Sequence, residues 1–295
     1  MRSPAVGAAT TPRQLHRGIG RRHGDPATSP TAIGPSALLV LAALPALAAA
    51  QANGGCVSLR GSSACPAFQS ASISTNNALI RTYPFLQFVS DSASFDYQLA
   101  AYVKTSYVKD KYQNVLGCND VNYTDPSNMY ARYTTTVLCN ALVQQSVSEC
   151  RLSGDSSRPV CADTCADFAR SEAFVTADQD LCSRPSPDVT KLIRADFTTC
   201  SLPDGALTSR CIAGVDNEPE NCGFANSTVG LCLYCAAGGI NSTDTCCYNA
   251  GAERRCDGVK LPSVVPTLTF STPSATSSPT QTAAGTRGGG GGGGP

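Results

Sequence analysis

Two reactive residue types stand out in this chain, cysteine and histidine, one by its abundance and the other by its scarcity. Cysteine accounts for 16 of 295 residues, whereas histidine occurs twice, at His16 and His23. If a leader is removed near residue 50, no imidazole remains for a Ser-His-Asp triad, a Cys-His pair or a histidine-ligated metal site. Acid–base chemistry in the remaining chain would therefore depend on carboxylates.

The nearest candidate for a carboxylate pair, of the kind glycosidases use, is the run Asp216-Asn-Glu218-Pro-Glu220. It lies in the short interval between Cys211 and Cys222. We interpret these acids as solvated turn residues, and we assign no catalytic residue, cofactor or metal to the chain. A secreted hydrolase that works without histidine is kept as an alternative function.

The cysteines predict a disulfide framework. An even number of cysteines behind a secretory leader indicates up to eight bridges. The pairs Cys232-x2-Cys235 and Cys246-Cys247 could imitate zinc ligands or a redox motif, but an oxidising compartment and the lack of a strand-to-helix pattern favour disulfides. The cysteines expected to pair are Cys56, Cys65, Cys118, Cys139, Cys150, Cys161, Cys165, Cys182, Cys200, Cys211, Cys222, Cys232, Cys235, Cys246, Cys247 and Cys256.

Residues 1–50 are predicted to be a leader with a signal peptide. Five arginines precede an uncharged apolar run over 36–50, which is shorter than the roughly 20 residues that a bilayer requires. Ala48 and Ala50 fit the small-residue pattern of signal peptidase. Cleavage would leave 17 basic and 21 acidic residues. We therefore expect a secretory-pathway, extracellular or cell-surface protein that does not bind nucleic acid.

The part of the chain that contains the first cysteines is expected to be helical. Phe95, Leu99, Tyr102, Val103 and Tyr107 follow the spacing of one apolar helix face. Cys139 and Cys150 would share a face of a second helix about 16 Å apart, too far to bond each other. Cys161 and Cys165, one turn apart, are likewise expected to take separate partners.

The composition divides the chain into four parts. Residues 51–190 are predicted to be a helical Cys-rich module and 191–260 a loop-rich, cystine-stapled module, which gives a mainly α, disulfide-rich fold class. Residues 261–295, rich in Ser, Thr, Pro and then Gly, are predicted to be a disordered stalk. Aromatic residues gather between Tyr83 and Tyr133, where we favour a core over an aromatic surface for glycan or lipid.

Three sequons predict N-glycosylation of surface loops. They begin at Asn122, Asn226 and Asn241. All three follow the predicted signal peptide, and Asn122 falls in the helical module while the other two fall in the loop-rich module. Glycosylation at these asparagines agrees with passage through the secretory pathway.

Several long motifs, in the same order, resemble the ectodomain of membrane-anchored SH3-domain proteins of filamentous fungi. The resemblance covers about residues 54–260 and includes CxxxxGSxxCPAF from Cys56, PFLQFVSDSASFD from Pro84, YARYTTTVLCN from Tyr130, RPVCADTCADFA from Arg158, IRADFTTC from Ile193 and NEPENCGF from Asn217. It implies a signal peptide, a Cys-rich ectodomain, a stalk, one transmembrane helix and a cytoplasmic SH3 domain. We expect this chain to be truncated before the last two, and membrane attachment only if it continues beyond residue 295.

The resemblance implies a non-enzymatic extracellular recognition or sensing module whose ligand is a wall glycan, a lipid or a protein. Residues Pro159 to Cys165 also resemble Frizzled-type cysteine-rich domains, which bind lipidated proteins or sterols. A secreted cell-wall structural protein or effector remains an alternative.

Overall fold

The computed structural model describes residues 55–238, 245–263, 266 and 268–270. The predicted leader over 1–50 and the sequon asparagine Asn241 lie outside the described residues, as does most of the predicted stalk. None of the helices in the described ranges combines the length and apolarity that crossing a bilayer requires.

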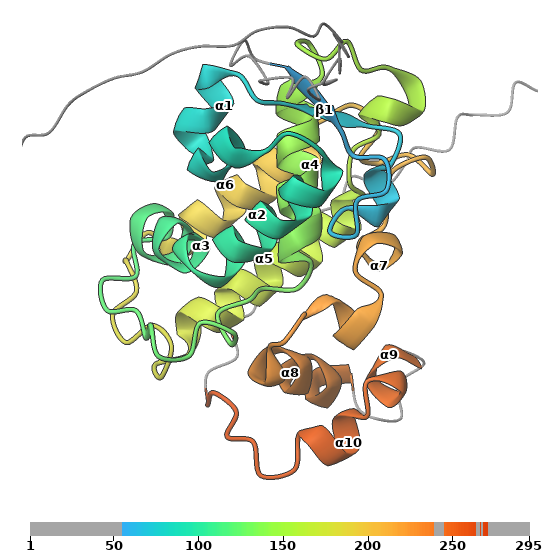
Figure 1. Cartoon of the computed structure of the whole chain (residues 1–295). Coiled ribbons are helices and arrows are strands. Elements are labelled where there is room, and N and C mark those ends of the chain that lie inside the picture. The colour runs from blue at the N-terminus through green and yellow to red at the C-terminus, as the bar shows by residue number, and fades with distance from the viewer. Residues whose placement is uncertain (1–54, 239–244, 264–265, 267, 271–295) are drawn as a thin grey trace, which may run out of the picture. The chain divides into compact units, whose positions relative to one another are not determined.

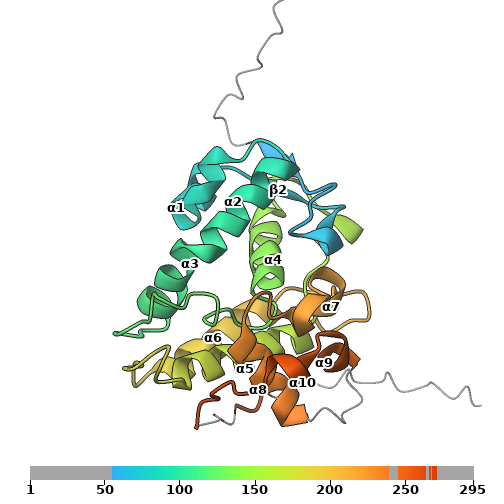
Figure 2. The ribbon, with the colours of Figure 1, turned by 60° about the horizontal axis from the view of Figure 1, so that its bottom comes forward.

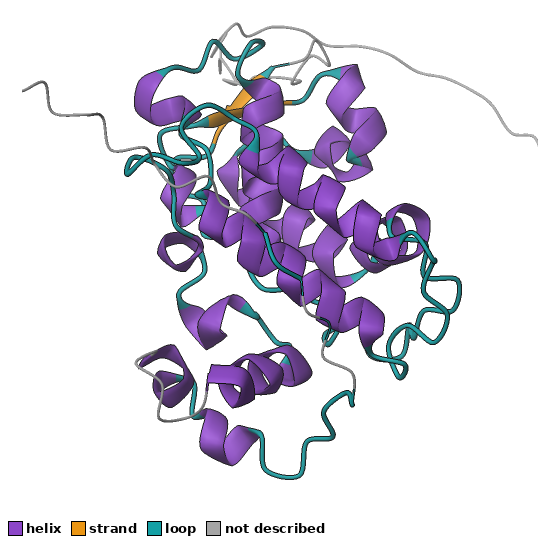
Figure 3. Ribbon diagram, turned by 180° about the vertical axis from the view of Figure 1, so that it is seen from behind, coloured by secondary structure: helices purple, strands orange, loops and turns teal. Residues whose placement is uncertain are grey.

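Helices form most of the described structure, which confirms the mainly α, disulfide-rich fold class (Figures 1 and 3). The α-helices are α1 (Asn77–Thr82), α2 (Ser92–Lys104), α3 (Ser106–Val108), α4 (Thr134–Ser146), α5 (Ala162–Ala177), α6 (Val189–Ser201), α7 (Gly214–Asn217), α8 (Thr228–Gly238), α9 (Thr245–Asn249) and α10 (Ala252–Arg255). Short 3₁₀ turns cover Pro66–Phe68, Pro84–Phe88, Gly154–Ser157 and Glu220–Gly223, and a π-helical segment covers Lys109–Val115.

One small antiparallel hairpin accompanies the helices. Strand β1 (Cys56–Ser58) pairs with β2 (Ser72–Ser74) in the register Cys56 to Ser74. Strand β2 packs against α4, where the Ser74 backbone N–H donates to the Ser146 hydroxyl at 2.8 Å. The hairpin thereby fixes the chain segment before α1 to the helical core.

Helix α2 begins at a capping box. The Asp91 carboxylate accepts a hydrogen bond from the Ser94 backbone N–H at 2.7 Å, and the Ser94 hydroxyl accepts one from the Asp91 backbone N–H at 3.0 Å. Two backbone donors that the first helical turn leaves without partners are satisfied in this way. The helix start, and therefore the rotation of its apolar face, is fixed locally.

The apolar face predicted from the spacing of Phe95, Leu99 and Tyr102 is buried in α2. Tyr107 enters the same core from α3. The α2 backbone ends before Thr105, whose φ of −122° and ψ of −75° depart from helical values. The predicted face therefore spans two elements.

The tyrosines of this region pack edge to face within the core. Tyr83 and Tyr102 have ring centroids 6.4 Å apart, Tyr102 and Tyr107 6.0 Å, and Tyr107 and Tyr112 6.3 Å. Such arrangements bring the positive edge of one ring to the negative face of the next. The core interpretation is confirmed for Tyr102, Tyr107 and Tyr112, and Tyr83 packs half-buried against them. Phe88, Tyr97 and Tyr123 of the same region are exposed.

All sixteen cysteines are paired. The bridges are Cys56–Cys150, Cys65–Cys139, Cys118–Cys182, Cys161–Cys211, Cys165–Cys200, Cys222–Cys246, Cys232–Cys256 and Cys235–Cys247. As predicted, neither Cys139 with Cys150 nor Cys161 with Cys165 forms a bond. So many bridges indicate an extracellular or secretory-pathway protein.

The buried apolar side chains form two clusters, which we term the first core and the second core. The first core contains buried residues from Leu59 to Ile212. The second core contains Cys222, Phe224, Leu231, Cys235, Cys247 and Ala252. Helix α6, which begins at Val189, belongs to the first core through Ile193. The clusters therefore separate between Ile212 and Cys222, downstream of the module boundary expected at residue 190.

Arg132 links the two cores. Its Nε donates to the Cys222 carbonyl at 2.7 Å, and its Nη1 lies 2.8 Å from Asp167 Oδ2 on α5. The guanidinium carbon lies 4.6 Å from the ring centroid of Tyr133 and 4.0 Å from that of Tyr234 on α8. Figure 2 shows α8 beside α5, and the two helices are in contact.

Glycines permit the close approach of the chain to Tyr133. A Cβ at Gly223 would lie 2.2 Å from the Tyr133 ring, and one at Gly214 would lie 2.6 Å from it. The Gly223 φ of +80° also favours glycine. The Tyr133 N–H donates to the Gly223 carbonyl at 2.7 Å, so the backbone itself is held at this junction.

Candidate functional site

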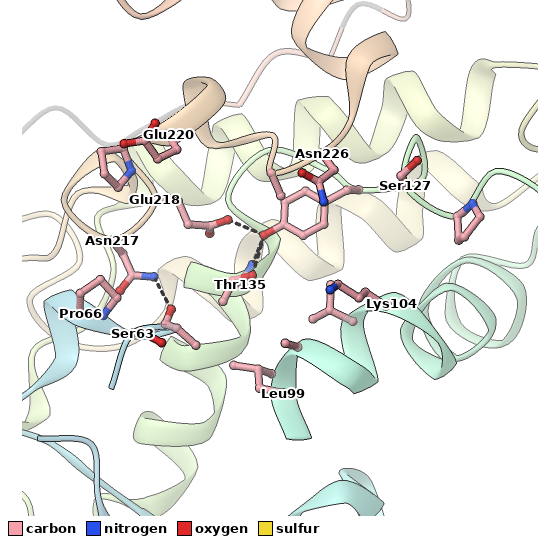
Figure 4. A pocket seen from close by; sticks show the side chains of 17 residues that line it. Ser63, Pro66, Leu99, Lys104, Ser127, Thr135, Asn217, Glu218, Glu220 and Asn226 are labelled. Carbon is pink, nitrogen blue, oxygen red and sulfur yellow. Dashed lines mark hydrogen bonds between the residues drawn. The ribbon is translucent and has the colours of Figure 1, made fainter. Parts of the chain in front are cut away.

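A cavity with a volume of about 780 Å³ lies among the described residues. Its walls come from residues 63–66, the α2 residues 99–104, residues 126–135 up to the start of α4, residues 217–220 from the end of α7 onward, and residues 225–226. Figure 4 shows Glu218 and Asn226 on one side, and Leu99 and Lys104 of α2 on the other. This volume lies in the range typical of sites for small molecules.

Apolar groups dominate the cavity walls. The half-buried Val103 and the exposed Ala100 line the cavity from α2, and the fully buried Leu99 borders it without reaching solvent. Pro66 and Pro126 add further apolar surface from the two loops. A ligand with an apolar body would release water from these walls on binding.

A half-buried acid, Glu218, lies at the polar end. Its Oε2 accepts hydrogen bonds from the Thr136 backbone N–H and from the Thr136 hydroxyl, both at 2.6 Å. Its Oε1 accepts the Tyr130 O–H. Burial raises the pKa of Glu218 above its usual range, and the hydrogen bonds from Thr136 and Tyr130 partly offset that rise.

The position of Glu218 follows from the start of α4. Tyr133 precedes this helix with a φ of +63° and provides no side-chain cap. Glu218 binds instead the free N–H of Thr136 in the first turn, where a negative charge is also favoured by the helix dipole. A residue 82 positions away in sequence thus completes the helix start.

The polar end is held rigidly. Besides donating to Glu218, the Tyr130 hydroxyl accepts the Thr135 backbone N–H at 2.9 Å and lies 2.6 Å from Thr135 Oγ1. Asn217 Nδ2 donates to Thr136 Oγ1 at 3.2 Å, and Asn217 Oδ1 accepts the Ala67 N–H at 3.1 Å. Burial raises the pKa of Tyr130 well above its usual value, so its hydroxyl stays protonated.

The three acids singled out in sequence differ in their surroundings. Asp216 and Glu220 are exposed, as expected of turn residues. The same interpretation is wrong for Glu218, because its carboxylate turns inward to the start of α4. The sequence analysis does not single out Tyr130 and Thr135 as site residues, although both belong to the motif that begins at Tyr130 and continues into α4. An acceptor for the first turn of that helix is not visible in sequence.

A second cavity, of about 370 Å³, lies beside a buried ionic cluster. Lys111 Nζ is 2.9 Å from Glu172 Oε1 on α5 and 2.7 Å from Asp196 Oδ2 on α6. Glu172 is fully buried, and burial raises its pKa to about 8 despite the neighbouring Lys111 ammonium. Because the Lys111 ammonium is held between these two acids, we interpret the cluster as structural, and the larger cavity as the candidate site.

The predicted glycosylation sites occupy different settings. Asn122 is half-buried, and its Nδ2 donates to the Asp180 carbonyl at 3.0 Å. Asn226 is exposed and lines the mouth of the larger cavity. Both asparagines reach the surface, but of the two only Asn226 borders the candidate site.

One group of cysteine sulfurs is close enough to resemble a metal site. The Sγ atoms of Cys222, Cys246 and Cys247 lie within 4.8 Å of one another. All three sulfurs are in disulfides: Cys222 is bonded to Cys246, and Cys247 is bonded to Cys235. Zinc binds cysteine as the thiolate, so these three sulfurs fit a disulfide cluster rather than a zinc site.

Comparison with known proteins gives no relative for this chain. No family model matches it, and neither a curated protein nor a solved structure is similar to it. The function must therefore be argued from the site itself.

Proposed function

We propose that this chain is an extracellular recognition protein that binds, in the 780 Å³ cavity, a small molecule with an apolar body and one hydroxyl group. The observation that carries the proposal is the pairing of largely apolar walls with a carboxylate, Glu218, that is held in place by Thr136 and Tyr130. The eight disulfides support an extracellular or secretory-pathway location for this binding.

Glu218 has room for one more donor. An ionised carboxylate offers about four acceptor positions. Hydrogen bonds from Thr136 fill two on Oε2, and the Tyr130 hydroxyl fills one on Oε1. The remaining position on Oε1 accepts the ligand hydroxyl in this proposal. An anionic ligand head would instead be repelled by Glu218.

The wall composition favours an amphipathic lipid over a glycan. Tyr130 is the one aromatic side chain that lines the cavity within the described residues, and it is 8% exposed. A sugar ring would find few polar partners along Leu99, Val103 and Pro126. The apolar walls suit instead the hydrocarbon body of a sterol or a long-chain alcohol.

The resemblance to ectodomains of fungal membrane-anchored SH3-domain proteins extends this proposal. In a longer protein of that kind, the ligand-binding domain stands outside the cell on a stalk. Occupancy of the cavity would then be the signal that reaches a cytoplasmic SH3 domain and its Pro-rich partners.

The test is a binding titration with the secreted, disulfide-bonded chain. The probes are a fluorescent sterol with a free 3-hydroxyl and the 3-methyl ether of the same sterol. Ala100→Trp places an indole in the cavity mouth, whereas Ala93→Trp places the same group on the exposed first turn of α2, away from the cavity. We expect saturable binding of the free sterol that Ala100→Trp weakens by about tenfold or more and Ala93→Trp leaves unchanged.

The methyl ether separates the two parts of the proposal. Because an ether cannot donate to Glu218, we expect it to bind about tenfold more weakly than the free sterol. Absence of saturable sterol binding, or equal binding by the two tryptophan variants, would contradict the proposed function. Equal binding of sterol and ether would remove the role of Glu218 as the acceptor.

A further inference from the structure

The structure places a glycosylation site at the entrance of the candidate cavity. Asn226 begins the sequon Asn-Ser-Thr, its side chain is exposed, and it lines the cavity opposite Lys104 (Figure 4). We propose that an N-linked glycan on Asn226 gates this cavity. This inference rests on the proposed function and adds a mode of regulation to it.

The attachment point of that glycan is held in place from both sides. On one side, Asn221 Nδ2 donates to the Ala225 carbonyl at 2.6 Å. On the other, Asn128 Oδ1 accepts the backbone N–H groups of Thr228 and Val229, each at 3.0 Å. Because the residues that flank Asn226 are fixed, the first sugar of the glycan starts from a fixed point at the cavity mouth.

The chemistry of glycan and cavity keeps the sugars at the entrance. Glycan transfer from a lipid-linked pyrophosphate donor joins the sugar to Asn226 Nδ2, which loses one proton as the lipid pyrophosphate leaves. The attached sugars are strongly hydrated, and entry between Leu99 and Val103 would cost their hydrogen bonds to water. They therefore occupy the solvent in front of the cavity, where they obstruct a ligand that enters or leaves.

Obstruction at the mouth selects ligands by size. A free sterol or alcohol can pass beside a mobile glycan, so the gate slows its entry and exit. A lipid attached to a protein would have to bring that protein against the glycan at Asn226. The gate thus favours small, free ligands over lipidated proteins.

The experiment compares association rates of the fluorescent sterol, measured by stopped flow, for chains secreted from a glycosylating host. Asn226→Gln and Thr228→Ala both remove the sequon, and the second keeps the Asn226 side chain and the backbone N–H that binds Asn128. Asn122→Gln removes a sequon that does not line the cavity. We expect association to be about tenfold faster in both Asn226-site variants and unchanged in Asn122→Gln.

The outcomes separate the gate from the binding function. Equal association rates in the wild-type chain and the Asn226-site variants would overturn the gate while leaving the binding site in place. Mass spectrometry that finds Asn226 without a glycan in the secreted chain would also overturn it. If no form binds the sterol, glycan-free forms included, the proposed function fails and the gate fails with it.

Discussion

The two cores of this protein reach stability in different ways. The first core buries apolar side chains from several long helices, and its five disulfides close intervals of 35 to 94 residues. The second core has six buried apolar residues, three of them cysteine, and its disulfides close intervals of 12 to 24 residues. Segments that bury so little surface depend on covalent links.

The cores also differ in buried charge. The first core contains Lys111, Glu172 and Asp196 in one buried cluster. The charged residues of α10, at the edge of the second core, are exposed at Glu253, Arg254 and Arg255. The first core should therefore respond to pH and the second to disulfide reduction.

Removal of single disulfides gives the largest expected contrast. The double variant Cys235→Ser, Cys247→Ser should lose about 2–5 kcal/mol, which we expect to exceed what the second core can tolerate. Hydrogen exchange of peptides from 222–256 should then approach that of an unfolded chain. The matched variant Cys161→Ser, Cys211→Ser should lower the melting temperature while helices of the first core remain protected. Equal loss of protection in both variants would show that the cores do not differ in this respect.

Loss of the link between the cores should have the next largest effect. Arg132→Ala removes the hydrogen bond to the Cys222 carbonyl, the ion pair with Asp167 and the stacking on Tyr133 and Tyr234. We expect a loss of about 3 kcal/mol in the free energy of unfolding.

The shape of the unfolding curve of Arg132→Ala is as informative as the loss of stability. If Arg132 couples the cores, its variant should unfold in two steps by chemical denaturation, with the second core first. Lys260→Ala removes an exposed ion pair with Asp180 and serves as the control, with no measurable change expected. A single cooperative transition in Arg132→Ala would mean that other contacts suffice to couple the cores.

The burial of Glu172 should make stability depend on pH, an effect that we expect to be smaller than those of the disulfide and Arg132 variants. Because the pKa of Glu172 is about 8 in the folded protein and near 4.5 in the unfolded chain, the folded state binds more protons between these values. Stability from this group is therefore greatest at low pH and falls as the pH rises through that window.

Glu172→Gln should remove this part of the pH dependence. Glutamine resembles the protonated acid, so the variant should lose less stability than the wild type between pH 5 and pH 8. Glu253→Gln, which changes an exposed acid beside the second core, should keep the wild-type slope. Parallel curves for wild type and Glu172→Gln would contradict the assignment of the titration to Glu172.

The sequence pattern predicts much of the first core because its signals are local. The spacing of Phe95, Leu99 and Tyr102 sets one helix face. The predicted absence of a bond between Cys139 and Cys150 is confirmed, but α4 ends at Ser146, so Cys150 lies beyond the helix on which it was expected. The pairing of each cysteine with its actual partner depends on how helices pack, which no local pattern encodes.

The candidate site was harder to predict because its parts are distant in sequence. Tyr130 and Glu218 are separated by 88 positions and meet because α4 begins without a side-chain cap of its own. The position of Glu172 on the apolar face of α5 is a weak sequence indication of a buried acid. Its partner Lys111 comes from another element, so the ion pair cannot be predicted from that face alone. Burial of a charged group depends on its non-local partner, and a single sequence does not reveal that partner.

The central claim is that the larger cavity binds a hydroxylated apolar molecule, and photo-crosslinking tests it most directly. A sterol with a free 3-hydroxyl and a photoreactive group in its body would be irradiated with the folded chain, and the labelled peptides mapped by mass spectrometry. We predict labels on residues 99–104 or 126–135, which competition by unlabelled sterol removes. Labels confined to exposed apolar positions such as Tyr248 and Leu202, or labels that competition does not remove, would contradict the claim.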